Sequence, residues 1–380
     1  MDAKRYNNIK LFWSITKTVV TFLLLLIFVA SGISEKLYVF IQNELSGKYL
    51  IFLIYVFTIG LGIAIIFLPL NFYTDFYLEH KLNLSNQTFI KWVWENTKAL
   101  LVSLVIGVPI LLFFYYSLLT FNGLWWLPFA IVLFIVSVIL ARIVPVFIMP
   151  LFYKISPIDD DELKERINKL AVEAGIKVEN VYKFDMSKNT KKANAAFTGI
   201  GKSKRILLGD TLLDSYSEDE IETVIAHELG HYKKKHIIKN IVIGTASSFL
   251  TLFLIALFYK LSLNWFGFEK IQEIAALPIL TLWGMLIGLI QTPITNVISR
   301  KYEYEADEYA VESTRKPGAF MSTLERLTEQ NFGDKNPHPF VEWFFYSHPS
   351  IKKRIDAVKN AALRLGLTQN IEEHLNLKGG

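Results

Sequence analysis

The sequence contains no cysteine among its 380 residues. Thiolate nucleophiles, disulfide bonds and zinc–thiolate sites are therefore excluded, because each of them needs a cysteine sulfur. Any catalysis by this chain must rest on histidine, carboxylate or arginine side chains, or on a metal ion. The chain also contains no internal repeat and no low-complexity segment.

Apolar residues are abundant. Hydrophobic residues make up 52% of the chain and aromatic residues 14%, and the mean hydropathy is +0.34. This composition is far from that of a soluble domain, so we expect a membrane protein. The net charge of +5 would suit nucleic acid, but in a membrane protein excess lysine and arginine more often marks cytoplasmic flanks and contacts with anionic lipid. We expect membrane lipid as a partner, and no nucleic acid.

Six apolar stretches are long enough to cross about 30 Å of hydrocarbon, which takes about 20 helical residues. They lie near Leu11–Ala30, Tyr49–Phe72, Ala99–Leu119, Leu124–Ile148, Ile237–Tyr259 and Ala275–Ile298. A cleaved signal is the alternative for the first stretch, because basic residues precede it and small residues follow it. We prefer an uncleaved anchor, because the apolar run is long for a signal.

Basic residues flank these spans in four groups, and alternation of the spans places all four groups on one side of the membrane. The groups are Lys4, Arg5 and Lys10; Lys81, Lys91 and Lys98; Lys233, Lys234 and Lys235; and Arg300 and Lys301. By the positive-inside rule that side is cytoplasmic. We expect a multi-pass protein of the cytoplasmic membrane in a bacterium, or of the endoplasmic reticulum membrane in a eukaryote.

The string His227-Glu228-Leu229-Gly230-His231 carries the clearest chemical signal in the chain. Residues four apart on a helix share a face, so His227 and His231 can both bind one catalytic zinc ion. Glu228 lies beside the pair, where it can take a proton from a zinc-activated water and pass it to a leaving amine. The alternative is a pair of helical surface histidines, since such strings also arise by chance.

A catalytic zinc needs a third protein ligand, and the segment Arg300–Asp307 offers one. Glu303 and Asp307 share a helical face at the same spacing of four. We expect Glu303 to bind zinc and Asp307 to accept the second ring N–H of a ligating histidine. Glu305 is our second choice as ligand. Two membrane crossings separate this segment from the histidines, so both face the same side.

The spans divide the chain into four regions. Residues 1–149 form a membrane part with four spans, 150–236 a cytoplasmic catalytic insertion, 237–299 two further spans, and 300–380 a helical C-terminal region. Within the insertion we expect a helix over Asp159–Gly175, a strand over Arg205–Gly209 and a capping box from Ser217 to Glu220. That capping box opens the helix that carries both histidines.

A strand beside a zinc helix suggests a peptide substrate, because an exposed strand edge can pair with an extended chain. Hydrolysis of a peptide bond also needs a donor for the oxyanion. The segment Ser347–Arg354 offers His348 and Arg354. The alternatives are a structural His-Pro loop and an ordinary surface arginine.

Taken together, these residues resemble the type I CAAX prenyl proteases, which are membrane-embedded zinc metalloproteases also called a-factor-converting enzymes. The resemblance covers most of the chain. It rests on Leu78–His80 with Asn86–Thr88, Pro150–Phe152, Asn194–Phe197, Lys204–Leu213, His227–Tyr232 with His236, Ser299–Arg300 with Glu303 and Asp307, and Tyr346–Pro349.

The resemblance implies a mainly α fold, in which a polytopic helical membrane domain encloses a chamber. A zincin-like (gluzincin) catalytic domain with a small β-sheet accompanies it. One Zn2+ per chain would bind His227, His231 and Glu303, with Glu228 as general base and Asp307 behind a histidine ligand. The resemblance further implies Asn194 and Ala195 as backbone partners of the substrate, and it places His348 and Arg354 at the scissile region. The substrate would be a peptide or protein, prenylated in the family.

Two features depart from the family pattern. The family has seven spans where this chain has about six, through differences before Tyr49, so one chamber wall is missing or supplied differently. The segment from Leu213 to Glu220 is shorter than the acidic insertion of many eukaryotic members, which suggests a prokaryotic protein.

Two other functions remain open at this point. One is a general quality-control metalloprotease of the heat-shock-induced type, which shares the histidine motif and a downstream glutamate but is shorter and has fewer spans. The other is a non-catalytic membrane scaffold with a structural zinc, against which the presence of Glu228 argues.

Overall fold

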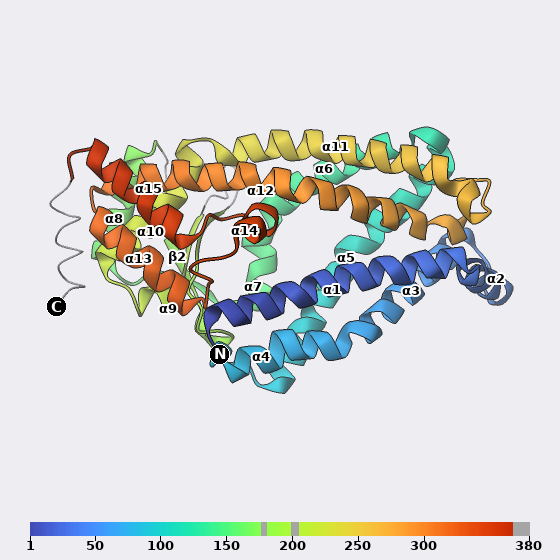
Figure 1. Ribbon diagram of the computed structural model, residues 1–380, viewed down its shortest axis with the longest axis horizontal. Helices are drawn as coiled ribbons and strands as arrows, with labels where there is room; N and C mark the ends of the chain where they lie inside the picture. The colour runs from blue at the N-terminus through green and yellow to red at the C-terminus, as the bar shows by residue number, and fades with distance from the viewer. Residues whose placement is uncertain (176–180, 199–204, 368–380) are drawn as a thin grey trace.

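Six long apolar helices build the membrane part of the protein (Figure 1). The computed structural model describes residues 1–175, 181–198 and 205–367. Within these residues six helices are long and apolar enough to cross a membrane, which confirms the number of spans expected from the sequence. They are α1 (Ala3–Ala30), α3 (Lys48–Asn71), α5 (Phe89–Phe121), α6 (Trp126–Ile143), α11 (His236–Ser262) and α12 (Pro278–Thr314).

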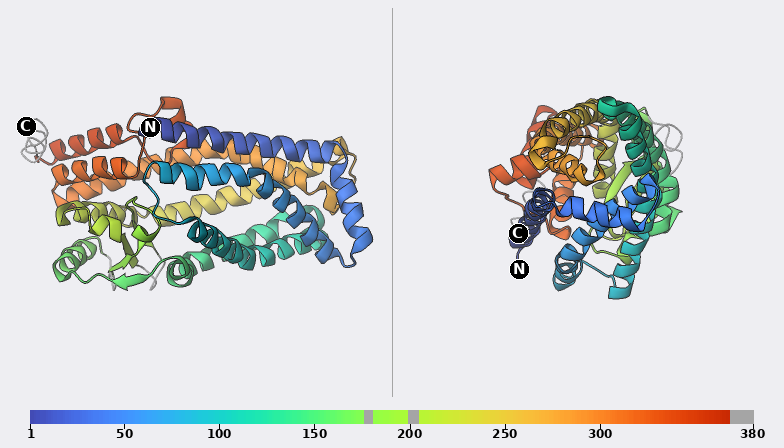
Figure 2. Two further views of the ribbon diagram at one scale, coloured as in Figure 1. Left: turned by 90° about the horizontal axis from the view of Figure 1, so that it is seen from below. Right: turned by 90° about the vertical axis from the view of Figure 1, so that its right-hand side faces the viewer.

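The six helices form a closed ring. Each packs against two neighbours, in the order α1, α12, α11, α6, α5, α3 and back to α1. The end-on view in Figure 2 shows this ring-like arrangement. A shorter helix, α2 (Ile33–Glu44), lies across the end of the ring that is remote from the catalytic domain and packs against α1 and α3. α2 therefore connects α1 and α3 at this end of the ring.

Aromatic packing holds the remote end of the ring together. Phe52 of α3 stacks on Tyr115 of α5 with ring centroids 4.4 Å apart, and both side chains are buried. Ser34 of α2 contacts the hydroxyl of Tyr55 at 2.5 Å and also donates to the carbonyl of Ala275. These polar contacts satisfy hydroxyl groups that would be costly to bury alone.

The catalytic domain lies at the other end of the molecule and combines helices with a small sheet (Figure 1). Its longer helices are α8 (Asp161–Glu173), α10 (Glu218–Lys233), α13 (Pro317–Gln330) and α15 (Ile351–Arg364). Short helices connect the parts: α4 (Leu78–Lys81), α7 (Met149–Phe152), α9 (Asp210–Leu213) and α14 (Pro339–Phe345). The predicted helix over Asp159–Gly175 corresponds to α8.

The sheet has four described strands in the order β1 (Ile155–Pro157), β2 (Val181–Phe184), β4 (Arg205–Gly209) and β3 (Ala195–Thr198). β2 and β4 run parallel, and the two outer strands are antiparallel to their neighbours. The predicted strand over Arg205–Gly209 is β4. The other strands have only three or four residues, too few to show an alternating pattern in the sequence. β3 lies at the edge of the sheet and contacts α10.

α12 joins the membrane part to the catalytic domain without a break. Its 37 residues include both the last span and the segment around Glu303. The expected boundary between residues 299 and 300 therefore falls inside one helix. The rigid helical backbone fixes where Glu303 lies relative to the membrane ring.

The first turn of α10 is anchored by Glu220. The expected capping box is present, because Ser217 and Glu220 exchange side chain–backbone hydrogen bonds. The buried Glu220 carboxylate also accepts from Ser322 at 2.9 Å and pairs with Arg326, both on α13. Burial by itself raises the pKa of Glu220, but the Ser217 backbone, Arg326 and Ser322 together hold this pKa below its usual value.

We expect Glu220→Gln to destabilise the protein by about 1–3 kcal/mol at neutral pH, because a buried, multiply bonded charge is lost. The pKa of Glu220 is lower in the folded than in the unfolded state, so its contribution is present above the unfolded value and is lost as the pH falls through the folded value. Thermal unfolding at neutral and acidic pH measures the stability of both proteins. We expect the difference in free energy of unfolding between wild type and variant to become smaller as the pH falls. A difference that does not change with pH contradicts the assignment.

The control is Glu329→Gln, on the exposed part of α13.

Candidate active site

The site begins with an unusually close contact between α10 and α12. Gly230 of α10 lies against Ala306 of α12, and a Cβ atom built on Gly230 would be 3.0 Å from the Ala306 Cα and 3.1 Å from its carbonyl oxygen. Both obstacles are backbone atoms, which cannot rotate away. Glycine at this position therefore permits the helix separation that brings the residues of the two helices together.

Three side chains converge where these helices meet. The Nε2 atoms of His227 and His231 lie 3.2 Å apart, and the Glu303 oxygens lie 3.5 and 3.4 Å from them respectively. One donor atom from each residue falls within 4.8 Å of the others, as ligands of one metal ion do. Glu303 Oε2 is buried and, among the described residues, receives no hydrogen bond of good geometry. A buried carboxylate whose two oxygens each face an imidazole nitrogen fits a bound cation.

Asp307 fixes the orientation of His227. Its Oδ1 lies 2.8 Å from His227 Nδ1, on the ring side opposite Glu303. A carboxylate accepts the proton of Nδ1, so the lone pair of Nε2 is left to face the three-residue cluster. Asp307 is almost completely buried, and Arg354 binds it bidentately through Nε at 2.9 Å and Nη2 at 2.6 Å.

A second hydrogen-bonded chain lies behind His231. His231 Nδ1 lies 3.0 Å from His236 Nδ1, and His236 Nε2 lies 2.9 Å from Glu305. Glu305 accepts the proton on His236 Nε2, so Nδ1 of the neutral His236 ring accepts the proton of His231 Nδ1. The lone pair of His231 Nε2 then faces His227 and Glu303. Glu305, our second choice as ligand, thus lies in an outer position.

The sequence named His236 only as part of the family resemblance and assigned it no role, because its spacing from His231 is not helical. Residues five apart on an unbroken helix lie about 140° apart around the axis. α10 ends at Lys233, and Lys235, which caps the start of α11, adopts the left-handed conformation with φ of 60°. This break turns His236, the first residue of α11, back toward His231, where its ring stacks on Tyr302 at 4.2 Å. A non-glycine residue in this conformation has no signature in the sequence.

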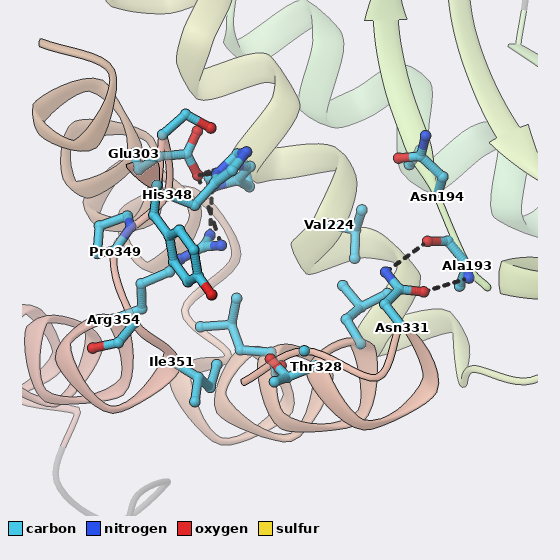
Figure 3. A pocket seen from close by; sticks show the side chains of 18 of the residues that line it. Ala193, Asn194, Val224, Glu303, Thr328, Asn331, His348, Pro349, Ile351 and Arg354 are labelled. Carbon is cyan, nitrogen blue, oxygen red and sulfur yellow. Dashed lines mark hydrogen bonds and ion pairs between the residues drawn. The ribbon is translucent and has the colours of Figure 1, made fainter. Parts of the chain in front are cut away.

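His348 and Arg354 reach the cluster from the C-terminal segment, as expected from the sequence (Figure 3). His348 Nδ1 lies 2.9 Å from Glu303 Oε2, and its side chain is 64% exposed. Arg354 Nη1 lies 3.7 Å from the same oxygen. Burial opposes the charge of Arg354, but the Asp307 and Glu303 carboxylates raise its pKa above the usual value. Arg354 therefore carries a permanent positive charge beside the cluster.

A cleft of about 530 Å³ opens in front of these residues. Glu228 lines it together with His227 and Glu303, and Asn194 and Ala195 line its opposite side. Figure 3 shows Asn194 across the cleft from Arg354. The cleft therefore has metal-binding chemistry on one wall and the edge strand on the other.

Asn331, at the end of α13, binds the backbone of the segment that leads into β3. Its side-chain Oδ1 accepts from the Ala193 N–H at 2.9 Å, and its Nδ2 donates to the Ala193 carbonyl at 3.1 Å (Figure 3). The Asn194 carbonyl accepts from Gly209 N–H at 2.9 Å and so is turned toward β4. In an antiparallel ladder the backbone of the next residue, Ala195, faces the free edge. Asn194 thus differs from expectation: it offers an exposed side chain to the cleft, whereas its carbonyl is already bonded.

Two family profiles cover almost the whole chain. The profile described as CAAX prenyl protease N-terminal, five membrane helices, matches residues 1–154, and that of peptidase family M48 matches residues 157–362. In the first region the structure has four long apolar helices, together with the 12-residue helix α2. The structure therefore has one long apolar helix fewer in this region than the five that the description of the profile names.

Known proteins resemble the chain over most of its length. An uncharacterized metalloprotease of Bacillus subtilis, YhfN, is 31% identical, with 93% of this chain and 84% of that protein covered. CAAX prenyl protease 1 of Saccharomyces cerevisiae is 34% identical over 77% of this chain and 68% of that protein. The crystal structure of S. mikatae Ste24p matches with a TM-score of 0.83 at 29% identity, covering 94% of this chain and 88% of that one.

The profile of peptidase family M48 covers more than half of the chain, and two relatives above 30% identity are covered over two thirds or more of their length. The cleft with its two histidines and glutamate lies within the matched catalytic region. The chain therefore belongs to peptidase family M48, as a multi-pass membrane metalloprotease homologous to CAAX prenyl protease 1 and Ste24p.

Proposed function

We propose that the protein is a zinc endopeptidase that hydrolyses a peptide bond held between the β3 edge and the histidine pair. His227, His231 and Glu303 bind the metal in this proposal. The observation that carries it is the convergence of these three donors, within 4.8 Å of one another, in a cleft that the edge strand also lines. Two imidazoles and one carboxylate are a ligand set of catalytic zinc sites with an open position.

Zinc at this position supplies Lewis-acid polarisation of the scissile carbonyl and activation of a water molecule. Glu228 is the general base: it takes a proton from the attacking water and delivers it to the leaving amine nitrogen. His348 and Arg354 donate N–H groups to the negative charge that develops on the carbonyl oxygen. The charge of Arg354 suits this role, because Asp307 keeps it protonated and oriented.

The edge strand positions the substrate. The Ala195 backbone pairs with an extended peptide by β-augmentation, and the exposed Asn194 side chain adds a further hydrogen-bonding group. Asn331 ties the start of this strand to the end of α13, because it binds both backbone groups of Ala193. Main-chain pairing gives affinity without demanding a particular side-chain sequence.

The membrane ring supports a proposal for the substrate class. In five of the six spans at most 17% of the apolar window is buried, which is less than a solid helix bundle would bury. We infer that the ring encloses a chamber and that a lipidated C-terminal peptide of the CAAX type enters it. The catalytic domain faces the cytoplasm in this proposal, because the basic flanks of the spans lie at its end. Support for this substrate comes from the yeast relative, whose name is CAAX prenyl protease 1.

Cleavage of a farnesylated C-terminal peptide, compared with an unmodified unfolded membrane protein, tests the substrate class. We expect the purified protein to cleave the farnesylated peptide faster, because the apolar interior of the ring receives the lipid. Faster cleavage of the unfolded protein would instead assign a quality-control role.

We expect Glu228→Gln to retain zinc and to lose peptide hydrolysis by on the order of 10³-fold, because it removes the general base and leaves the three ligands. Elemental analysis and turnover of a fluorogenic peptide measure the two properties separately. Glu312→Gln, on the exposed face of α12, is the matched control and keeps both. Hydrolysis by Glu228→Gln at the wild-type rate would remove Glu228 from the mechanism.

His236→Phe tests the chain of hydrogen bonds behind His231. Phenylalanine keeps the ring that stacks on Tyr302 but cannot accept the proton of His231 Nδ1, so we expect zinc affinity to fall about 10- to 100-fold. Competition with a chromogenic chelator measures this affinity without reference to catalysis. Glu305→Gln keeps an acceptor for His236, so we expect it to lose less zinc affinity than His236→Phe. Equal affinity in wild type and His236→Phe would show that His236 does not orient His231.

A further inference from the structure

α14 carries an unusual concentration of aromatic residues beside the membrane ring. The helix Pro339–Phe345 reads Pro-Phe-Val-Glu-Trp-Phe-Phe. Two of these side chains are directed away from the protein, since Phe340 is 56% and Trp343 48% exposed. The two views in Figures 1 and 2 place α14 on the outer side of the molecule, next to α1 and α12. Large exposed aromatic side chains on adjacent turns mark an interaction surface.

The position of α14 coincides with the end of the last span. Asn296 of α12 donates to the Phe344 carbonyl at 2.7 Å, and Arg300 donates to the Glu342 carbonyl at 2.9 Å. The same part of α12 exposes the apolar side chains of Ile290, Ile294 and Val297. The first basic residue after the span is Arg300, which marks the level of the lipid headgroups.

An apolar groove continues this surface toward the membrane. It has a volume of about 490 Å³ and lies between α1 and α12, with Phe22 and Leu289 among its lining residues. Phe344 and Phe345 of α14 close one end of it. The aromatic face of α14 is therefore continuous with the lipid-facing surface of two spans.

We propose that α14 is an interfacial helix that lies among the lipids of the leaflet next to the catalytic domain, with Phe340 and Trp343 inserted between headgroups and acyl chains. Aromatic side chains favour this depth, because their flat apolar rings and polar edges suit a boundary between hydrocarbon and water. Continuity with the spans decides for lipid as the occupant: the groove beside α14 is lined by the exposed Leu286 and Leu289 of α12, which lie within the last span.

This helix also holds the C-terminal part of the active site. The buried Glu342 accepts from the Ser350 N–H at 3.1 Å and pairs with Lys353 at 3.0 Å. Ser350 precedes α15, the helix that carries Arg354. Arg300 donates to the Tyr346 carbonyl as well, two residues before His348. The depth of α14 in the lipid therefore sets the position of His348 and Arg354. The consequence for catalysis rests on the proposed function.

The absence of cysteine makes the depth of α14 directly measurable. A nitroxide label on Phe340→Cys or Trp343→Cys, in the full chain in phosphatidylcholine–phosphatidylglycerol liposomes, reports its collisions with oxygen and with a water-soluble nickel complex. Ile290→Cys on α12 is the reference for lipid, and Val172→Cys on α8, 72% exposed, is the reference for water. We expect both α14 labels to resemble Ile290→Cys, with high oxygen and low nickel accessibility.

Two results would overturn the interfacial position. Nickel accessibility as high as at Val172→Cys places α14 in water, and low accessibility to both reagents places it under protein, for example a second copy of the chain. Neither measurement depends on catalysis, so failure of the proposed peptidase function leaves this test intact.

Peptide hydrolysis in liposomes tests whether the lipid contact of α14 affects the active site. We expect the double variant Phe340→Glu/Trp343→Glu to hydrolyse peptide on the order of 10- to 100-fold more slowly in liposomes, because small displacements of reacting groups carry such losses. Its zinc content stays at the wild-type level, since no ligand is touched. Val172→Glu is the control and keeps full activity. Wild-type hydrolysis by the double variant would show that the lipid contact of α14 does not set the position of His348 and Arg354.

Discussion

The approach of α10 to α12 at Gly230 is the constraint on which the rest of the structure depends. Two helices that carry half of a metal site each must meet at backbone distance, and the missing side chain of Gly230 leaves Ala306 room to do so. From this contact follow the spacing of His227 and His231 from Glu303 and the bond between Asp307 and His227. A side chain at residue 230 would press on backbone atoms of α12 and shift these pairs together, because all of them cross the same helix interface.

Each imidazole of the cluster is oriented by a different outer partner. His227 has a buried carboxylate, Asp307, whose charge Arg354 balances, whereas His231 has a second imidazole backed by the half-buried Glu305. A carboxylate–arginine pair keeps its charge over a wide pH range, and a histidine chain does not. The two histidines therefore differ in how firmly their tautomers are held, although both present Nε2 to the same point.

Local spacing explains what the sequence could and could not predict. The pairs His227/His231 and Glu303/Asp307 are four residues apart on helices, so their shared faces could be inferred, and the six spans follow from apolar length alone. The contact of His236 with His231 could not be inferred, because a left-handed residue, Lys235, interrupts the helix before His236. The short strands and the order of helices in the ring depend on contacts between distant segments, which no local pattern records. Asn194 was expected to offer its backbone, but the register of β3 on β4 decides which carbonyls remain available.

The unbroken course of α12 has a mechanical consequence. One helix of 37 residues passes from the far end of the ring to Glu303, so a movement of its part in the bilayer is transmitted to Glu303. In a membrane whose hydrocarbon layer is thinner than the span, a helix is accommodated by tilting or kinking. Tilting α12 displaces Glu303 relative to the histidines of α10, unless a kink at Pro293 confines the change to the span. Membrane thickness thereby affects the position of Glu303 relative to His227 and His231.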